Sequence, residues 1–372
     1  MGNIENDLML SRHQKPWLSL LSVILLAIGG LLVGQSIGMG IVAYAYDLGL
    51  EEILSGITGL SEDFKIPIYI IQGFSALFAF ILAPLFYLYV MEKKGVSILS
   101  PLSIKSAMPL LLAVLIAIVF IPVSFKVMEW NTQLSLGEWA TEQEENLEEV
   151  TRLLTNMDGF GQFLLAMLVI AIVPAVGEEL LFRGLIQNKL QAWTLNAHVA
   201  IWLTAIMFSA MHLQFYGFIP RMLLGALFGY LYFWSGNLIL PIVAHFVNNG
   251  FQLIMLYIYQ SRLTELNIDE VEQVPWPVFI TTSLIALALI YYFRRHFNER
   301  HPASHKWQRV FSTDKTHQAE IVKAVLDDNH LDPVIINKKD SAYDRFGDIE
   351  VHVIHENVMR ARQIIDNEIN FE

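Results

Sequence analysis

The chain has 372 residues, of which 54% are hydrophobic and 16% are charged, and its formal net charge is −12. An apolar bias of this size, arranged in long runs, is typical of a polytopic membrane protein rather than a large soluble enzyme. The lack of cysteine excludes disulfides, thiolate catalysis and cysteine-ligated metals, and the negative charge argues against a nucleic-acid partner.

Eight apolar segments approach or exceed the roughly 20 residues that a membrane-spanning helix needs. They cover residues 17–46, 67–91, 107–125, 159–183, 197–214, 218–235, 238–259 and 275–293. The first segment is longer than the apolar region of a cleavable signal, about 7–15 residues, so we expect it to be retained. The sequence therefore predicts an all-α polytopic membrane protein with about eight transmembrane helices in residues 1–300.

The loop charges predict an orientation in the membrane. Basic residues precede the first segment and follow the second and the last, at Arg12, Lys15, Lys93, Lys94, Lys105, Arg294, Arg295 and Arg300. The alternate loops are acidic, at residues 51–63, 129–149 and 265–272. Since loops rich in Lys and Arg stay in the cytoplasm, we expect a multi-pass protein of the cell (inner) membrane with both termini cytoplasmic.

The stretch from Glu138 to Leu154 is polar with a weak helical period. It is typical of a solvated helix on the outer face of the membrane. A lid that faces the substrate is the alternative, and the sequence leaves both open.

Residues 301–372 predict a small cytoplasmic α+β domain of the order β-α-β-β-α, near the lower size limit for independent folding. The expected strands are Trp307–Phe311, Val334–Asn337 and Ile349–Ile354, the helices Thr316–Asp328 and Asn357–Glu368, and a loop is expected at Lys338–Tyr343.

Two adjacent glutamates, Glu178 and Glu179, lie inside the fourth apolar segment, where each carboxylate costs about 2.5–3.5 kcal/mol. Consecutive helical residues point about 100° apart. Glu179 can pair with Arg183 at the i, i+4 spacing, which leaves Glu178 to face a cavity. Pro174 cannot bond back to Ile170, so a loosened turn there is expected to admit water. The alternative is a mutually satisfied Glu–Glu–Arg cluster that only locks helices together.

Further polar residues occur in two other apolar segments. His212 lies near the end of the fifth, while His245 and Asn249 share one helical face of the seventh. Asn248, about 60° round from His245, is the second choice for the amide. Each could instead be a packing residue or hydrogen-bonding glue between helices.

Together these side chains form a set suited to hydrolysis. Glu178 could activate water as a general base, and a histidine with an asparagine could stabilise an oxyanion. Glu178, His212 and His245 would also suit a catalytic zinc with water as fourth ligand. A metal-free mechanism and a zinc mechanism therefore both remain open.

The residues resemble the CAAX prenyl protease and bacteriocin-processing (Abi) family of intramembrane peptidases over residues 105–260. The family motifs EExxxR, FxxxH and HxxxN appear in order as Glu178-Glu179…Arg183, Phe208…His212 and His245…Asn249. The resemblance implies an eight-helix core with a cavity open to the cytosol. The family has been described both as metal-independent glutamate peptidases and as metalloproteases.

The resemblance also implies roles for the motif residues. Glu178 and His212 would hold the attacking water, while His245 and Asn249 would stabilise the oxyanion. We expect supporting positions at Glu179, Arg183 and Phe208. The predicted activity is that of a membrane endopeptidase, which cuts a peptide or protein substrate, prenylated or bacteriocin-like, near the membrane surface.

Two other functional classes remain. One is a transporter or bacteriocin-immunity factor that uses the same polar core as a proton or ligand site. The other is a membrane scaffold whose working part is the tail. The tail separately resembles a small prokaryotic domain described as a signal-transducing module, over Val310–Asp314, Ala319–Lys323, Ile336–Asp340 and Phe346–Val351, which indicates a bacterial origin and leaves its partner unknown.

The hydrolytic hypothesis makes a geometric demand. If residues 197–214 simply cross the membrane, His212 would lie toward the face opposite Glu178. We therefore expect either that residues 184–196 turn back into the membrane or that the spans are short, tilted and offset. If Glu178 and His212 lie far apart, the hypothesis fails.

Overall fold

The computed structural model describes residues 16–93, 107–134, 137–265, 273–300, 307–337, 348–354, 357–369 and 371. The predicted positions Arg12, Lys15, Lys94, Lys105 and Lys338–Tyr343, and the acidic loop after Glu265, lie outside these residues. The chain divides into two compact units, one of Met1–Trp193 with His198–Phe293 and one of Thr194–Ala197 with Arg294–Glu372. The first is helical and the second holds a three-stranded sheet, so the predicted fold class is confirmed.

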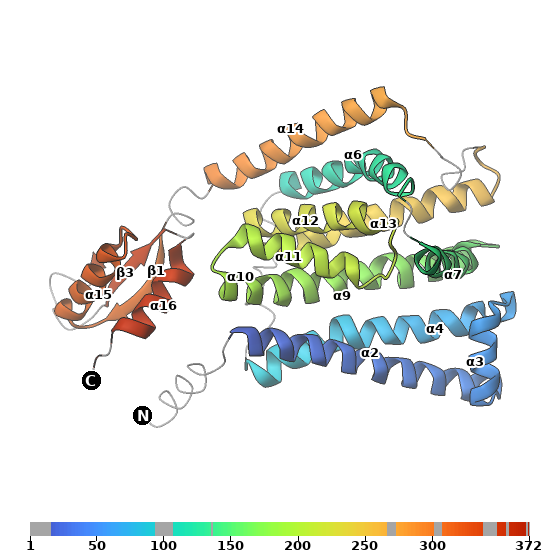
Figure 1. Cartoon of the computed structure of the whole chain (residues 1–372), viewed down its shortest axis with the longest axis horizontal. Helices are drawn as coiled ribbons and strands as arrows, with labels where there is room; N and C mark the ends of the chain where they lie inside the picture. The colour runs from blue at the N-terminus through green and yellow to red at the C-terminus, as the bar shows by residue number, and fades with distance from the viewer. Residues whose placement is uncertain are drawn as a thin grey trace. The chain divides into compact units, whose positions relative to one another are not determined.

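Six of the described helices are long and apolar enough to cross a membrane, and they lie side by side in Figure 1. Four are continuous: α2 (Pro16–Tyr46), α6 (Ala107–Asn131), α13 (Ile239–Gln260) and α14 (Trp276–Arg300). The second span along the chain joins η1 (Glu62–Phe64), α4 (Lys65–Ala76), η2 (Leu77–Leu82), α5 (Ala83–Phe86) and η3 (Tyr87–Met91). The span that carries the two glutamates joins α8 (Phe160–Ala166), η5 (Met167–Ile172), α9 (Val173–Glu179), η6 (Leu180–Gln187) and α10 (Asn188–Thr194).

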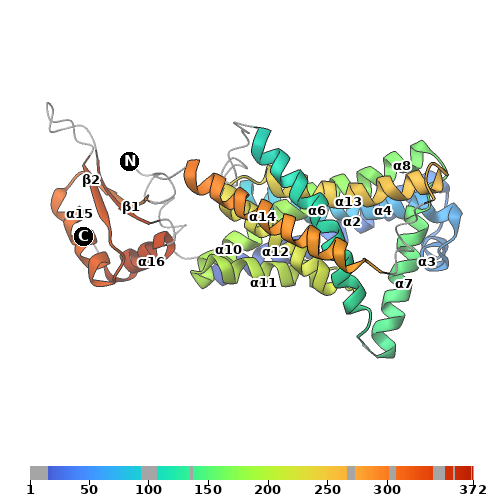
Figure 2. The same ribbon diagram turned by 90° about the horizontal axis from the view of Figure 1, so that it is seen from above.

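The fifth and sixth apolar segments predicted from the sequence, residues 197–214 and 218–235, are also helical. Neither is among the six helices that are long and apolar enough to cross a membrane. Helix α11 (Ala197–Ala210) has 14 residues, about 21 Å, which is shorter than the ~30 Å apolar core of a bilayer. The chain then turns back into α12 (Phe218–Ser235). The predicted segment 197–214 is therefore a short helix followed by a turn. The first unit is completed by α3 (Leu50–Gly59) and α7 (Glu138–Thr155), of which α7 runs across the other helices in Figure 2.

A stripe of glycines lets α2 pack closely against the second span. A methyl group added at Gly30 or Gly34 would lie 2.6 or 2.4 Å from the carbonyl oxygens of Phe78 and Phe74. Small residues at four-residue spacing allow this close backbone approach in membranes, where packing rather than the hydrophobic effect drives helix association. The opposite side of α2 exposes large apolar side chains such as Leu32, 58% exposed, as a lipid-facing helix does.

The span that carries the two glutamates is interrupted by π-helical turns on both sides of α9. Segments η5 and η6 flank α9, and Pro174 lies at its start. Proline has no N–H to return to the preceding turn, and π-turns often occur at functional sites. The loosened backbone expected at Pro174 is therefore present. The helix nevertheless continues to Thr194, eleven residues beyond the predicted end at Arg183.

The second unit is a small α+β domain. Strands β1 (Gln308–Thr313) and β2 (Val334–Asn337) both pair antiparallel with the central β3 (Ile349–Val353). Helices α15 (Thr316–Asp328) and α16 (Val358–Glu368) supply Ala319, Val322 and Ala361 to a core shared with β3. The predicted bounds of α15 and β2 are reproduced, and the other three elements differ by two residues or fewer at each end.

Candidate active site

The two glutamates of α9 diverge, as expected for consecutive helical residues. Both are buried, with 6% of Glu178 and none of Glu179 exposed. Oε1 of Glu179 accepts a hydrogen bond from Nη1 of Arg183 at 2.7 Å and another from Nδ1 of His245 at 2.8 Å. The predicted Glu179–Arg183 pair thus forms, and a residue from a second predicted motif joins it.

Arg183 is fully buried and makes contacts in three directions. Besides Glu179, its Nη2 donates to the carbonyl of Gly225 at 2.7 Å. Its guanidinium carbon lies 4.7 Å from the ring centroid of Phe208 and 5.4 Å from that of Phe228, a cation–π arrangement. The missing side chain of Gly225 lets α12 lie close to α11, because an added methyl would lie 3.2 Å from the Phe208 ring. Arg183 therefore joins α9–η6 to α11 and α12.

His245 lies between the two glutamates. Since a carboxylate oxygen only accepts hydrogen bonds, its Nδ1 carries the hydrogen given to Glu179. In the neutral imidazole this leaves Nε2 with a lone pair, and Nε2 lies 3.9 Å from Oε2 of Glu178. The ring is stacked on Phe228, with centroids 5.1 Å apart and an interplanar angle of 22°. The tautomer and orientation of His245 are thus set by Glu179 and Phe228.

Glu178 is not neutralised in the way that Glu179 is. Its Oε2 is buried and has no hydrogen-bond partner within the described ranges. The distance of 3.9 Å to His245 is too long for a direct hydrogen bond. The prediction that Glu179 is occupied by Arg183 while Glu178 is left over agrees with this geometry.

His212 lies in the turn after α11, on the same side of Phe208 as the site that holds His245. The long helix to Thr194 carries Glu178 deep into the bundle, and the short α11 returns from there. The ring of Phe208 then contacts both imidazoles, with centroids 5.2 Å from His212 and 5.8 Å from His245. One alternative expected residues 184–196 to turn back into the membrane. Residues 184–194 instead continue the helix.

The hydrogen bond of His212 fixes its tautomer. Nδ1 lies 2.9 Å from the carbonyl oxygen of Phe208, and because a carbonyl only accepts, Nδ1 is the donor. Its Nε2 is left to accept a hydrogen bond. No hydrogen bond or ion pair joins His212 to Glu178 in the part of the chain that the structure describes.

Asn249 satisfies the carbonyl that proline leaves without its usual partner. Pro174 has no N–H to give to the oxygen of Ile170, and Nδ2 of Asn249 donates to that oxygen at 3.3 Å. Asn248 donates in turn to Oδ1 of Asn249 at 3.1 Å. Asn249 therefore joins α13 to η5, one turn along α13 from His245.

Arg221 lies near the motif residues although none of the three motifs contains it. It lies close enough to Glu178 and His212 for its positive charge to act on both side chains. Its Nη2 donates to Gln214 at 2.5 Å, and its guanidinium lies over Gly217. Its Nη1 is buried without a hydrogen-bond partner in the described chain. A charged residue inside an otherwise apolar helix was the available signal.

Helix α7 contacts the turn that carries His212. Oε2 of Glu144 accepts from the backbone amides of Phe215 at 2.8 Å and Tyr216 at 3.4 Å. The ring of Trp139 lies edge-on to Phe215, with centroids 5.3 Å apart. If α7 is a lid that faces the substrate, it must contact this turn, and it does so here through Glu144 and Trp139.

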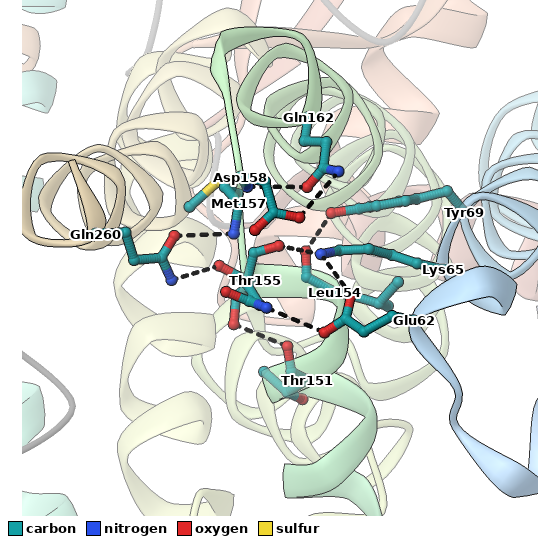
Figure 3. Close-up of polar contacts among 11 residues, drawn as sticks. Glu62, Lys65, Tyr69, Thr151, Leu154, Thr155, Met157, Asp158, Gln162 and Gln260 are labelled. Carbon is teal, nitrogen blue, oxygen red and sulfur yellow. Dashed lines mark hydrogen bonds and ion pairs between the residues drawn. The ribbon is translucent and has the colours of Figure 1, made fainter.

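The other end of α7 is anchored by polar contacts (Figure 3). Lys65 and Tyr69 of α4 donate to the carbonyls of Asn156 and Leu154. Gln260 of α13 makes two bonds of 2.9 Å to the backbone on either side of Asn156. The C-terminal end of α7 is therefore tied to two spans.

The side chains as placed do not fit the three-ligand zinc site that the sequence offered as one option. Among the described residues, no three His, Asp or Glu side chains lie close enough together to hold a metal ion. Of the three proposed ligands, His245 directs Nε2 toward Glu178, while His212 is held through Phe208. We therefore derive no step through a metal.

Comparison with known proteins assigns this part of the chain. Residues 160–251 match the family model described as type II CAAX prenyl endopeptidase Rce1-like. This segment is Rce1-like. The predicted resemblance is confirmed, and all seven predicted motif residues lie inside the Rce1-like segment.

One curated relative is an uncharacterized protein, YpbD, of Bacillus subtilis (strain 168). It is 32% identical over 82 residues, which make up 21% of this chain and 39% of that protein. The chain thus spans about two fifths of the length of this relative. No solved structure matches. The Rce1-like segment and its membrane helices describe a multi-pass membrane protein.

Proposed function

We propose that the protein is an intramembrane endopeptidase in which Glu178 activates water for attack on a peptide bond. The observation that carries the proposal is the pair of buried atoms Glu178 Oε2 and His245 Nε2, 3.9 Å apart within the Rce1-like segment. Both atoms are hydrogen-bond acceptors when His245 is neutral. A water about 2.8 Å from each would donate one hydrogen to each.

In the proposed reaction the water oxygen attacks the carbonyl carbon of the scissile bond. Glu178 takes one proton from that water as the C–O bond forms. The same proton passes to the leaving nitrogen when the C–N bond breaks, giving a carboxylic acid and an amine. Glu178 then returns to its starting form.

The geometry favours roles for His245, His212 and Asn249 that differ from those implied by the resemblance. His245 is the imidazole nearest to Glu178, so we assign it to holding the water. Its Nδ1 is engaged by Glu179, and its Nε2 lacks a hydrogen for an oxyanion in the neutral form. His212 becomes a second acceptor near the substrate, and Asn249 positions the helix beside Pro174.

Arg221 is the donor that we assign to the oxyanion. Its Nη1 is buried without a partner among the described residues, and its charge acts on Glu178 and His212. A preorganised donor of this kind stabilises the negative charge that develops in the transition state. The substrate class that we propose is a membrane-associated peptide, prenylated or bacteriocin-like, as the family description suggests.

Replacing Arg221 by glutamine is expected to lower kcat by about a hundred- to a thousand-fold with little change in KM. The measurement is the cleavage rate of a peptide library by the purified protein, followed by mass spectrometry. Arg152→Gln, an exposed arginine of α7, is the matched control and should leave the rate unchanged. A loss in KM alone would instead make Arg221 a substrate-binding residue.

Removing the tail is expected to leave cleavage within about a factor of three. The hydrogen bonds and ion pairs described around Glu178 join residues of α9 to α13, and none of them involves residues 307–371. The measurement compares the full chain with one that ends after Arg300. A complete loss of cleavage in a truncated protein that still purifies as a monodisperse species would favour the scaffold hypothesis.

A further inference from the structure

The turn that carries His212 lies at one identifiable end of the helical bundle. Nδ2 of Asn131, the last residue of α6, donates to the carbonyls of Phe215 at 2.9 Å and Tyr216 at 2.5 Å. Glu144 of α7 binds the amides of the same two residues. Residues 211–217 therefore lie beside the C-terminus of α6 and the N-terminal half of α7.

Other contacts gather further helix ends at the same place. The C-terminal end of α7 is bonded to the start of α4 through Lys65 and to the end of α13 through Gln260 (Figure 3). At the end of α6, Glu129 accepts from the amide of Val274, which precedes α14. We call this the acidic end of the bundle, since α3 and α7 lie there. Helix α7 alone has six glutamates and one arginine.

The opposite end of the bundle is basic. Lys189 of α10 pairs there with Glu92, which follows η3. The described basic side chains at this end of the first unit include Lys93 and Lys189. Short loops rich in Lys and Arg remain in the cytoplasm, so the charges assign the acidic end to the non-cytoplasmic side.

The packing around Glu178 is closed toward the basic end. All eight residues of η6, from Leu180 to Gln187, are buried. The five apolar side chains among them pack with Leu20, Tyr87 and Leu88 in one core. Toward the acidic end the packing opens, because His212 is only half-buried and Leu213 is 68% exposed.

From this geometry we infer that substrate reaches Glu178 from the acidic end, past residues 211–217 and α7. The scissile bond then belongs to a peptide segment on the non-cytoplasmic side of the membrane. This inference rests on the proposed function for its substrate. It differs from the cytosolic cavity that the resemblance implies.

The absence of cysteine makes the direction of access directly measurable. Three single-cysteine variants are labelled with a membrane-impermeant maleimide, first in intact cells and then after permeabilisation. Leu213→Cys reports the His212 turn, Glu145→Cys reports α7, and Lys93→Cys is the matched control at the basic end. All three positions are exposed.

We expect Leu213→Cys and Glu145→Cys to be labelled in intact cells and Lys93→Cys only after permeabilisation. The reverse pattern would overturn the inference, and so would labelling of Leu213→Cys from the same side as Lys93→Cys. If Leu213→Cys does not accumulate, Glu145→Cys decides alone. Labelling does not depend on hydrolysis, so an inactive protein would refute the proposed function without changing this result.

A second measurement connects the direction of access to the reaction. Modifying Leu213→Cys in intact cells with a bulky impermeant maleimide is expected to lower cleavage at least tenfold, whereas the same treatment of Lys93→Cys should not. Inhibition through Lys93→Cys alone would overturn the inference.

Discussion

Replacing Glu178 by glutamine is expected to lower cleavage by about a hundred- to ten-thousand-fold, because an amide cannot take a proton from water. Glutamine keeps the size of the side chain, and Oε2 of Glu178 has no hydrogen-bond partner to lose among the described residues. The midpoint of thermal unfolding should therefore not fall. Both quantities are measured on the purified protein in detergent, with cleavage read by mass spectrometry of a peptide library.

The control for this variant is Glu148→Gln, an exposed glutamate of α7 whose side chain is 64% exposed. It should leave both cleavage and unfolding unchanged. Full cleavage by a folded Glu178→Gln protein would refute the assignment of the base. A transporter or immunity factor would instead yield no products that depend on Glu178.

Replacing Arg183 by leucine is expected to lower the free energy of unfolding by about 3–5 kcal/mol, since it leaves Glu179 buried without its counterion. The measurement is unfolding of the purified protein in detergent. The chain contains a matched control in Arg152→Leu. Arg152 and Glu148 have the same i, i+4 spacing and the same 2.7 Å contact, but their side chains are 76% and 64% exposed.

The exposed pair is expected to contribute less than about 1 kcal/mol. Similar losses of unfolding free energy for Arg183→Leu and Arg152→Leu would show that burial does not set the energy of the Arg183–Glu179 pair. A double variant, Glu179→Gln with Arg183→Leu, should recover part of the loss because no charge is then left unpaired. This comparison separates the structural glutamate from Glu178.

Periodic patterns correctly predicted the elements whose ends are marked by residues close together in the sequence. The tail helix Thr316–Asp328 and strand Val334–Asn337 were delimited correctly because amphipathic spacing and turn residues mark their ends. The Glu179–Arg183 pair was also predictable, since i, i+4 residues on a helix are neighbours. These features depend on residues close together in the sequence.

Features that depend on tertiary partners were missed or misplaced. Arg183 marked the predicted end of a span, yet the carbonyl of Gly225 and two aromatic rings let it lie inside the bundle and the helix continue. The bond between His245 and Glu179 joins residues 66 positions apart. Arg221 lies in none of the three motifs, and its position near Glu178 depends on the folded chain.

The hydrolytic role of Glu178 is tested most directly by comparing the N- and C-termini of membrane proteins in cells that make the wild-type chain, Glu178→Gln or Glu148→Gln. We expect a set of new termini that the wild type and Glu148→Gln share and that is missing from Glu178→Gln at equal protein levels. The same set of termini in all three would contradict a hydrolytic role for Glu178.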